Sequence, residues 1–328
     1  MVLEVRVVTG GGVAWQHSNR APGTATAGVA GAGSRSACSK AASPFSRTSV
    51  GLDLAAAMLG SEGCLGIITS VVMKVVPLPE VSEHASYLFQ NFQTGVAFCR
   101  ELSFSSGRLG LASCRLLDNR QLRLGKAMKG DEDDGGSGIA AAAKSLLSAA
   151  KMGYIGIVKR WDSTETSAAT LVFEGSPREA SLQRREVSRI ARAHGGVSGG
   201  ARAGKSGYDL TFAIAYLRDF ALLFDVLGES FETFVCWTAL EGLCDKVRGR
   251  VRREHRARGL RGEPFVTHRV TQLYPEGACV YFYLAIYAQG VRDPTGVFAE
   301  LEEAARDEIL LSGGSLSHHH GIGKARAG

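Results

Sequence analysis

The sequence predicts an α+β fold in which antiparallel strands and helices share a hydrophobic core. Residues 265–273 and 279–287 alternate apolar and polar positions and are joined by Pro275-Glu276-Gly277, which is typical of a β-hairpin. Asp293-Pro294 then opens a predicted helix that reaches about Leu311. Strands paired as hairpins and mixed with helices indicate an antiparallel α+β domain and not a doubly wound parallel sheet.

The composition indicates a folded chain of about two domains. Apolar residues make up 45% and charged residues 21% of the 328 residues, which excludes disorder throughout the chain. Glycine is frequent, at 41 residues, but proline contributes only 8, so collagen-like and Pro/Gly-rich chains are excluded. The net charge of +6 favours anionic ligands, although it is too small and too dispersed to predict nucleic-acid binding.

The cysteines and the apolar runs bear on the compartment. No C-x-x-C pair occurs among the seven cysteines, so we expect reduced, mostly buried thiols and neither a disulfide framework nor a zinc site. The longest apolar run, residues 278–288, is too short to span a membrane as a helix. Charged residues within the first six positions do not resemble a secretory signal. We therefore expect an intracellular protein.

The pattern of elements divides the chain near residue 80. A strand over residues 2–8, a helix over 52–59 and a strand over 67–76, ended by Pro77 and Pro79, are predicted in the first part. Residues 17–49 are rich in Ala, Gly, Ser and Arg and are expected to form a flexible insertion. In the second part, strands are predicted at 85–88, 114–117 and 168–174, and helices over 93–103 and 178–193. An exposed acidic loop is expected at 129–137. A further helix is predicted to begin at a capping box formed by Thr238 and Glu241 and to end at Gly259.

A glycine turn lies between the predicted helix at 52–59 and the following strand. Gly60, Gly63 and Gly66 would expose consecutive backbone N–H groups and allow close approach of a pyrophosphate or a flat ring. The spacing is not G-x-G-x-x-G, which excludes a Rossmann fingerprint. A plain tight turn explains the spacing equally well.

Three adjacent histidines, His318, His319 and His320, stand near the end of the chain. Neighbours in an extended segment point to opposite faces, so the three imidazoles cannot all bind one metal ion, and no metal site is expected. A P-loop is excluded because Ala325 stands where Ser or Thr is required. A solvated tract is favoured by composition over a mobile loop that shuttles protons.

Several single residues allow two interpretations. Tyr281 and Tyr283 share one face of a predicted strand, where most tyrosines are core residues. Arg218, expected at the end of an apolar strand, and Arg115 can each form an ion pair or bind a phosphate. The dipole of a helix C-terminus or an anionic membrane could attract a basic cluster made of Lys246, Arg248, Arg250, Arg252, Arg253, Arg256, Arg258 and Arg261.

Several segments together resemble the FAD-linked oxidase superfamily, which has the vanillyl-alcohol-oxidase type of fold. Residues 60–69 and 75–80 resemble the end of its FAD-binding, PCMH-type domain. Four further segments resemble the branch of the superfamily that makes ether lipids: residues 226–233, 269–272, 277–283 and 313–324. The His triplet distinguishes this branch from the 2-hydroxyacid dehydrogenases. The resemblance implies a remnant of the FAD-binding domain over residues 1–80 and an antiparallel-sheet-plus-helices substrate cap domain over residues 81–328, without its last helices.

The resemblance also implies an activity. Members of this branch exchange the acyl chain of acylglycerone phosphate for a long-chain fatty alcohol, giving alkylglycerone phosphate and a fatty acid through an adduct on flavin N5. FAD as cofactor, the peroxisome as location, peripheral membrane association and a homodimer are all compatible with it, although no targeting signal is visible. The alternatives are an FAD-dependent 2-hydroxyacid dehydrogenase and an inactive truncated remnant.

Roles for individual residues follow from the same resemblance. Tyr281 would be the general acid and base, and His318, His319 and His320 would support activity by deprotonating the alcohol. Arg218 would bind the substrate phosphate, and Arg115 would maintain the active site. The flavin would contact Glu62, Gly63, Cys64, Leu65, Gly66, Ile67 and Ile68. The family's glycine-rich pyrophosphate loop is not found in the sequence, so we expect this polypeptide to hold FAD poorly.

Overall fold

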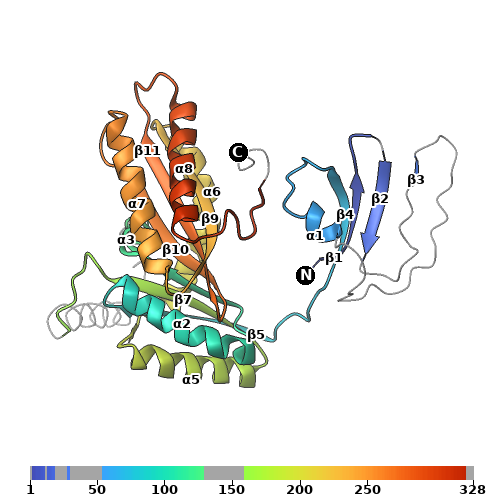
Figure 1. The fold of residues 1–328 in the computed structure, drawn as a ribbon. Helices are drawn as coiled ribbons and strands as arrows, with labels where there is room; N and C mark the ends of the chain where they lie inside the picture. Colours follow the sequence, from blue (N-terminus) through green and yellow to red (C-terminus); the bar gives the residue numbers. More distant parts are fainter. Residues whose placement is uncertain (1, 12, 19–27, 30–53, 129–158, 323–328) are drawn as a thin grey trace. The chain divides into compact units, whose positions relative to one another are not determined.

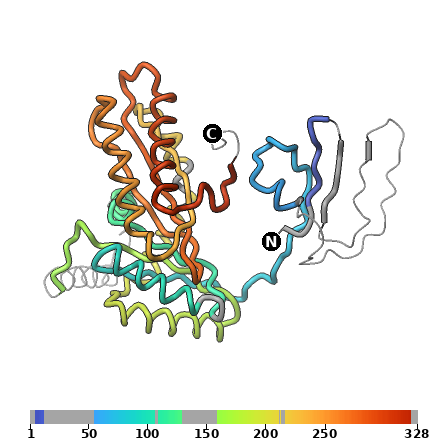
Figure 2. The backbone as a smooth tube through the Cα atoms, viewed as in Figure 1, coloured from blue at the N-terminus to red at the C-terminus, as the bar shows by residue number. Residues whose placement is uncertain are grey.

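The computed structural model describes residues 2–11, 13–18, 28–29, 54–128 and 159–322, which divide into two compact units (Figures 1 and 2). One unit comprises Met1–Leu78 together with Ser317–Gly328, and the other comprises Pro79–Leu316. The predicted loop at 129–137 and most of the expected insertion at 17–49 lie outside the described residues. Residues 17–18 and 28–29 of that insertion form parts of strands.

The first unit is built on a four-stranded antiparallel sheet of order β3-β2-β1-β4. A small core forms where β1 meets the helix α1, because Val5 and Val7 pack with Ala55 and Met58. All seven residues of β4 are exposed. The elements are β1 (Val2–Val8), β2 (Val13–Ser18), β3 (Gly28–Val29), α1 (Leu54–Met58) and β4 (Ile67–Met73).

The second unit is built on a seven-stranded antiparallel sheet of order β8-β5-β7-β6-β10-β11-β9. Its strands are β5 (Val81–Phe89), β6 (Ser113–Leu117), β7 (Ser167–Gly175), β8 (Val197–Ser198), β9 (Val226–Cys236), β10 (Phe265–Leu273) and β11 (Gly277–Tyr287). The predicted hairpin is confirmed, since β10 and β11 pair from Phe265 opposite Ala285 to Leu273 opposite Ala278. The close approach of β9 requires Gly277, because a Cβ atom there would lie 2.1 Å from the carbonyl oxygen of Val235.

Helices cover one face of this sheet and bury its apolar side chains (Figure 1). The pair α7 (Leu240–Ala257) and α8 (Pro294–Leu311) packs over β9 to β11, and the pair α2 (Phe92–Leu109) and α5 (Pro177–Ala193) packs over β5 to β7. Successive strand residues point to opposite faces, so the even-numbered residues of β11, such as Val280 and Phe282, enter this core. The odd-numbered residues of β11, including Tyr281, face the other side of the sheet.

Two helices lie against that other side, α3 (Asn119–Ala127) and α6 (Ala201–Leu222). The prediction that Arg218 ends a strand is therefore wrong, because it lies in the last turn but one of α6. Aromatic residues spaced four apart, such as Tyr208 and Phe212 with ring centroids 5.5 Å apart, fit the helical period. Glycine is needed at position 204 for packing, since a Cβ atom there would lie 2.4 Å from the carbonyl oxygen of Ala85.

The predicted capping box at Thr238 and Glu241 is also wrong. The residue before α7 is Ala239, which already has helical dihedral angles and whose side chain caps nothing. A capping box does open α5, where Ser176 accepts from the backbone of Glu179 and the Glu179 carboxylate accepts in return. The predicted helices at α5, α7 and α8 are confirmed within a few residues of their ends, and the helix predicted over 93–103 is confirmed but continues to Leu109.

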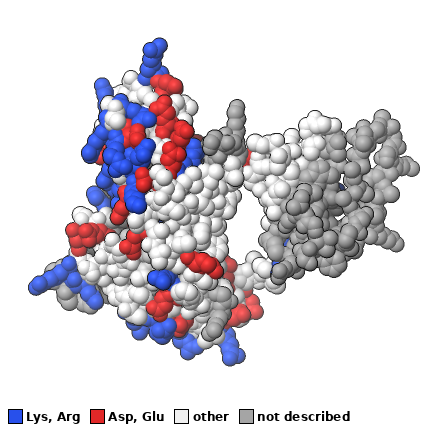
Figure 3. All heavy atoms as spheres, viewed as in Figure 1, with Lys and Arg blue, Asp and Glu red and all other residues white. Residues whose placement is uncertain are grey.

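The predicted basic cluster on and after α7 is interleaved with carboxylates, as the mixed charges of Figure 3 show. Arg250 pairs with Glu254 at 2.8 Å, and Arg258 pairs with Glu254 at 2.6 Å and with Glu300 at 3.0 Å. These ion pairs favour an ordinary solvated face over an anion-binding patch. None of the described helices is both long and apolar enough to cross a bilayer.

A buried carboxylate, that of Asp118, ties four elements of the second unit together. It caps α3 by accepting from the backbone N–H of Gln121 at 2.9 Å, and it accepts from the hydroxyl of Thr267 on β10. The backbone N–H of His268 and the guanidinium of Arg248 on α7 donate to its second oxygen at 3.3 and 3.5 Å. Since a buried carboxylate must be satisfied by such donors, these bonds fix β6, α3, β10 and α7 with respect to one another.

We predict that Asp118→Ala destabilises the second unit by about 3 kcal/mol, because it leaves several buried donors without an acceptor. Urea unfolding measures this change. The control is Asp209→Ala, which removes an exposed ion pair with Lys205 and should change stability by less than about 1 kcal/mol. Equal losses in the two variants would contradict the role of Asp118.

We also predict a dependence of stability on pH from His268. Burial lowers the pKa of His268 to about 4, whereas an unfolded histidine titrates near 6.5. Only the unfolded chain binds a proton between these values, so stability falls by up to about 3 kcal/mol as the pH drops from about 6.5 to about 4. In His268→Gln, which can still accept from Arg248, unfolding measured across this range should show a flatter pH profile. Identical slopes would refute this assignment.

Candidate active site

Polar and aromatic side chains gather on the face of the second sheet opposite its core. Tyr281 lies directly across from Arg269 of β10 on one side and from Glu232 of β9 on the other. Tyr283 follows on the same face, with its ring stacked 6.4 Å from that of Tyr281. Both tyrosines are half-buried, whereas Arg269 and Glu232 are buried. The residues therefore form a row of carboxylate, phenol and guanidinium groups across three neighbouring strands.

The guanidinium of Arg269 lies over both tyrosine rings. Its carbon is 5.4 Å from the ring centroid of Tyr281 and 5.1 Å from that of Tyr283, which is the range of cation–π contacts. Burial lowers the pKa of Arg269, and the positive charge of Arg115 adds to this effect. The sequence did not identify Arg269 and Glu232 as site residues. The available signal was their location, since Arg269 lies in the predicted strand 265–273 and Glu232 in the family-like segment 226–233.

The phenol of Tyr281 holds its proton strongly. Burial, followed by the neighbouring Cys279 and Glu232, raises its pKa to about 12, and Arg269 acts in the opposite direction. Burial also raises the pKa of Tyr283, against the effect of Arg269 and Arg115. Tyr281 is thus protonated at neutral pH and is able to donate a hydrogen bond to a bound carbonyl oxygen.

The two arginines expected from the resemblance occupy different surroundings. Arg115 on β6 holds its guanidinium 4.8 Å from the ring centroid of Tyr208, on α6. Arg218 is exposed and donates from one nitrogen to both carboxylate oxygens of Glu229, at 2.8 and 2.9 Å. A phosphate would have to share or replace this carboxylate on Arg218. The positive charge of Arg115 thus acts on Tyr283, whereas Arg218 is paired with Glu229.

An apolar cavity of about 590 Å³ opens beside Tyr283 on this face. Side chains of α6, β9, β10 and β11 form most of its wall, and Arg218 with Glu229 supplies its charged groups. Its volume lies within the range of small-molecule sites. Its apolar lining includes Leu124, Leu217, Phe220, Phe224, Val226, Phe265 and Leu284.

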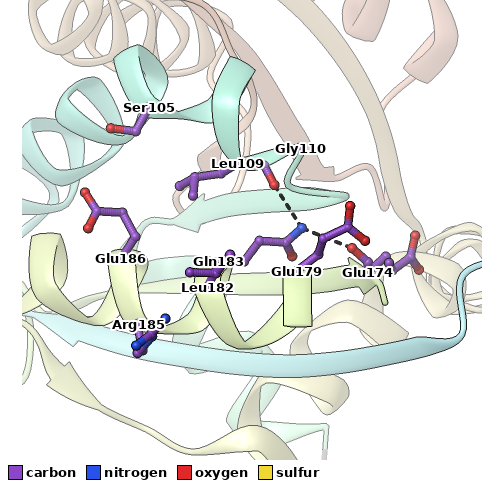
Figure 4. A pocket seen from close by; sticks show the side chains of 10 residues that line it. Ser105, Leu109, Gly110, Glu174, Glu179, Leu182, Gln183, Arg185 and Glu186 are labelled. Atoms are coloured by element: carbon purple, nitrogen blue, oxygen red, sulfur yellow. Dashed lines mark hydrogen bonds between the residues drawn. The ribbon is translucent and has the colours of Figure 1, made fainter. Parts of the chain in front are cut away.

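A second hollow of about 710 Å³ lies between α2 and α5 (Figure 4). Gln183 crosses it and donates to the carbonyl oxygens of Leu109 and Glu174, at 2.9 and 3.0 Å. Its carboxylates already have roles, since Glu179 caps α5 and Glu186 pairs with Arg189. We assign it no chemistry.

In the first unit, the glycine turn and the His segment lie against each other. The N–H of Ile322 donates to the carbonyl oxygen of Gly60 at 3.0 Å. A Cβ atom on Gly321 would lie 2.7 Å from that oxygen and 2.9 Å from the carboxylate of Glu62, and Gly321 has φ of +95°. Only glycine fits this approach without strain.

The imidazoles of this segment touch one another. The Nδ1 atoms of His318 and His319 are 2.7 Å apart, and the ring centroids of His319 and His320 are 4.8 Å apart. His318 is half-buried, and the other two rings are exposed. Such a contact requires one nitrogen to donate and the other to accept, so His318 and His319 can pass a proton between them.

The turn at residues 62–68 fits one side of a flat ring. Open space surrounds the Cβ position of Gly63, and Leu65 and Ile67 are 55% and 69% exposed. The turn leads into β4, whereas pyrophosphates usually bind where a turn leads into a helix N-terminus. Within the described part of this unit, the residues thus fit contact with an isoalloxazine ring and not pyrophosphate binding.

Comparisons with known proteins show the family of the chain. The model of the family "FAD linked oxidases, C-terminal domain" matches residues 78–328. The chain is 43% identical over 280 residues to an alkyldihydroxyacetonephosphate synthase of Caenorhabditis elegans, covering 85% of this chain and 45% of that protein. It is 31% identical to the synthase of Trypanosoma brucei brucei, covering 85% of this chain and 44% of that protein. The chain thus spans about half the length of these relatives.

Solved structures share the fold. A structure of alkyldihydroxyacetonephosphate synthase matches with a TM-score of 0.69 at 23% identity, over 97% of this chain and 49% of that one. A p-cresol methylhydroxylase with bound substrate matches with a TM-score of 0.56 at 14% identity, over 98% of this chain and 58% of that one. The predicted α+β fold class, with antiparallel sheets and helices as in PCMH-type proteins, is confirmed.

We predict that Gly321→Ala loosens the His segment. The new methyl group would collide with the carbonyl oxygen of Gly60, and backbone strain of 1–3 kcal/mol corresponds to about tenfold faster hydrogen exchange at the Ile322 amide. Hydrogen exchange measured by NMR or mass spectrometry tests this. The matched control is Gly63→Ala, which has a similar φ of +85° but open space around its Cβ position. Equal exchange rates at Ile322 in both variants would rule out the steric contact.

Proposed function

The chain belongs to the FAD-linked oxidase family, and on this basis we propose that it supplies the substrate side of an alkyldihydroxyacetonephosphate synthase. FAD is the cofactor of this family. The proposed reaction replaces the acyl chain of acylglycerone phosphate with a long-chain alcohol and releases a fatty acid, so it forms the ether bond of an ether lipid.

One observation carries the proposal: Tyr283, whose ring stacks on that of Tyr281, lines an apolar cavity that has an arginine in its wall. Tyr281 would sit beside the substrate ketone, and its neighbour Tyr283 lines the cavity. Apolar walls suit an acyl or alkyl chain, because burying each CH₂ group is favourable by about 0.8 kcal/mol. Arg218 suits a phosphate headgroup once Glu229 releases it.

The residues of this chain would divide the work. Since burial raises the pKa of Tyr281 to about 12, Tyr281 would donate a proton or hydrogen bond to the substrate before it accepts one. The histidines 318–320 would take the proton of the incoming alcohol. Residues 62–68 would contact the isoalloxazine ring, which when bound supplies an electrophilic nitrogen for the exchange.

We predict that Tyr281→Phe lowers exchange of the acyl chain for labelled hexadecanol by at least about 100-fold, because general acid–base catalysis typically contributes that much. The assay uses the purified chain with FAD in large excess, which compensates for the weak binding of FAD that we expect. The control is Tyr287→Phe, an exposed tyrosine on the same face of the same strand, which should retain exchange. Undiminished exchange by Tyr281→Phe would refute the role of Tyr281, and flavin reduction by lactate without exchange would favour a 2-hydroxyacid dehydrogenase.

A further inference from the structure

Arg269 is a cation whose charge acts on Tyr281. Three other groups face it as well, the carboxylate of Glu232, the thiol of Cys279 and the phenol of Tyr283, and each of them disfavours a phenolate. Arg115 acts one step further away, on Tyr283 and on Arg269 itself. Beyond burial, the Glu232 carboxylate and the Arg269 guanidinium therefore act on Tyr281 in opposite directions.

The backbone fixes this balance. Glu232, Tyr281 and Arg269 are directly opposite one another on β9, β11 and β10, and cross-strand neighbours hold their Cβ atoms about 5 Å apart. Such a register cannot slip by one residue without turning every side chain to the opposite face. The register thus holds the carboxylate of Glu232 and the guanidinium of Arg269 on either side of the phenol of Tyr281.

Arg269 is a buried cation that lies over the faces of two tyrosine rings. The residue is only 7% exposed, and its buried Nε atom has no hydrogen-bond partner within the described residues. A buried guanidinium with so little compensation is costly unless a nearby group supplies negative charge. The faces of the two tyrosine rings supply part of it, and a phenolate on Tyr281 would supply more.

We propose that Arg269 is a positioning residue that, opposed by Glu232, sets the proton affinity of Tyr281. The proposal rests on the proposed role of Tyr281 as the group that exchanges a proton with the substrate. A phenol that burial alone controlled would give up its proton too reluctantly to act as a base. The guanidinium lowers this cost while the phenol still holds its proton at rest, so both halves of a proton exchange remain accessible.

Titration of Tyr281 tests the proposal without substrate or flavin. Tyrosines are replaced globally by 3,5-difluorotyrosine, whose lower intrinsic pKa brings the transition into a range where the protein is folded. Fluorine NMR then follows each ring with pH, and the Tyr281 signal is identified by its loss in Tyr281→Phe. We expect Arg269→Met to raise the pKa of this ring by at least about one unit and Glu232→Gln to lower it by a similar amount.

Two further variants separate electrostatics from folding. Arg269→Lys keeps the charge but cannot cover both rings, so it should raise the pKa of Tyr281 by less than Arg269→Met does. It replaces Arg269→Met in the test if that variant does not fold. Arg192→Met removes an exposed arginine whose guanidinium bonds to Ser188, and it should shift nothing. Shifts of opposite sign at Arg269 and Glu232 cannot arise from general loosening of the sheet.

The outcomes are distinct. An unchanged Tyr281 titration in a folded Arg269 variant overturns the proposal, whatever the activity. Conversely, the expected shifts together with full exchange activity in Tyr281→Phe would leave the electrostatic coupling standing and refute the proposed catalytic role of Tyr281. Expected shifts together with a lost exchange activity support both.

Discussion

The buried carboxylate of Asp118 is the constraint on which the arrangement of the second unit depends. It ends β6, caps α3, and accepts from adjacent residues of β10, while Arg248 reaches it from α7. A carboxylate removed from water must be surrounded by donors, so these elements cannot move independently. The bonds to Thr267 and His268 also fix the orientation of β10, which determines the face on which the next residue, Arg269, is placed.

The alternation of a strand separates stability from chemistry in β10 and β11. Val280 and Phe282 enter the core beneath α7 and α8, whereas Tyr281 and Tyr283, between and after them, face the polar side. Each site residue is therefore anchored by apolar neighbours in the chain that are fully buried. Packing on the opposite face of the sheet thus helps to hold this charged row in position.

Much of this could be predicted from the sequence, and the exceptions have physical causes. The hairpin was predictable because both strands alternate and a Pro-Glu-Gly turn joins them. Helix α6 was not, because Gly204 and Gly207 resemble helix breakers when they are in fact needed for close contact with β5 and β7. Tyr281 was found through family resemblance, whereas the partnership with Arg269 depends on strand register, which a single sequence does not reveal.

The cavity beside Tyr283 discriminates between the two chemistries that this fold could support. A 2-hydroxy acid such as lactate is small and polar, so it would leave most of a cavity of about 590 Å³ unfilled and its apolar lining in contact with water. An amphiphile fills the same space with its chain and can offer an anionic headgroup to Arg218. The exposed bond between Arg218 and Glu229 contributes little to stability, so a doubly charged phosphate can displace the carboxylate at small cost. Shape and charge together thus favour a phosphorylated lipid over a small hydroxy acid.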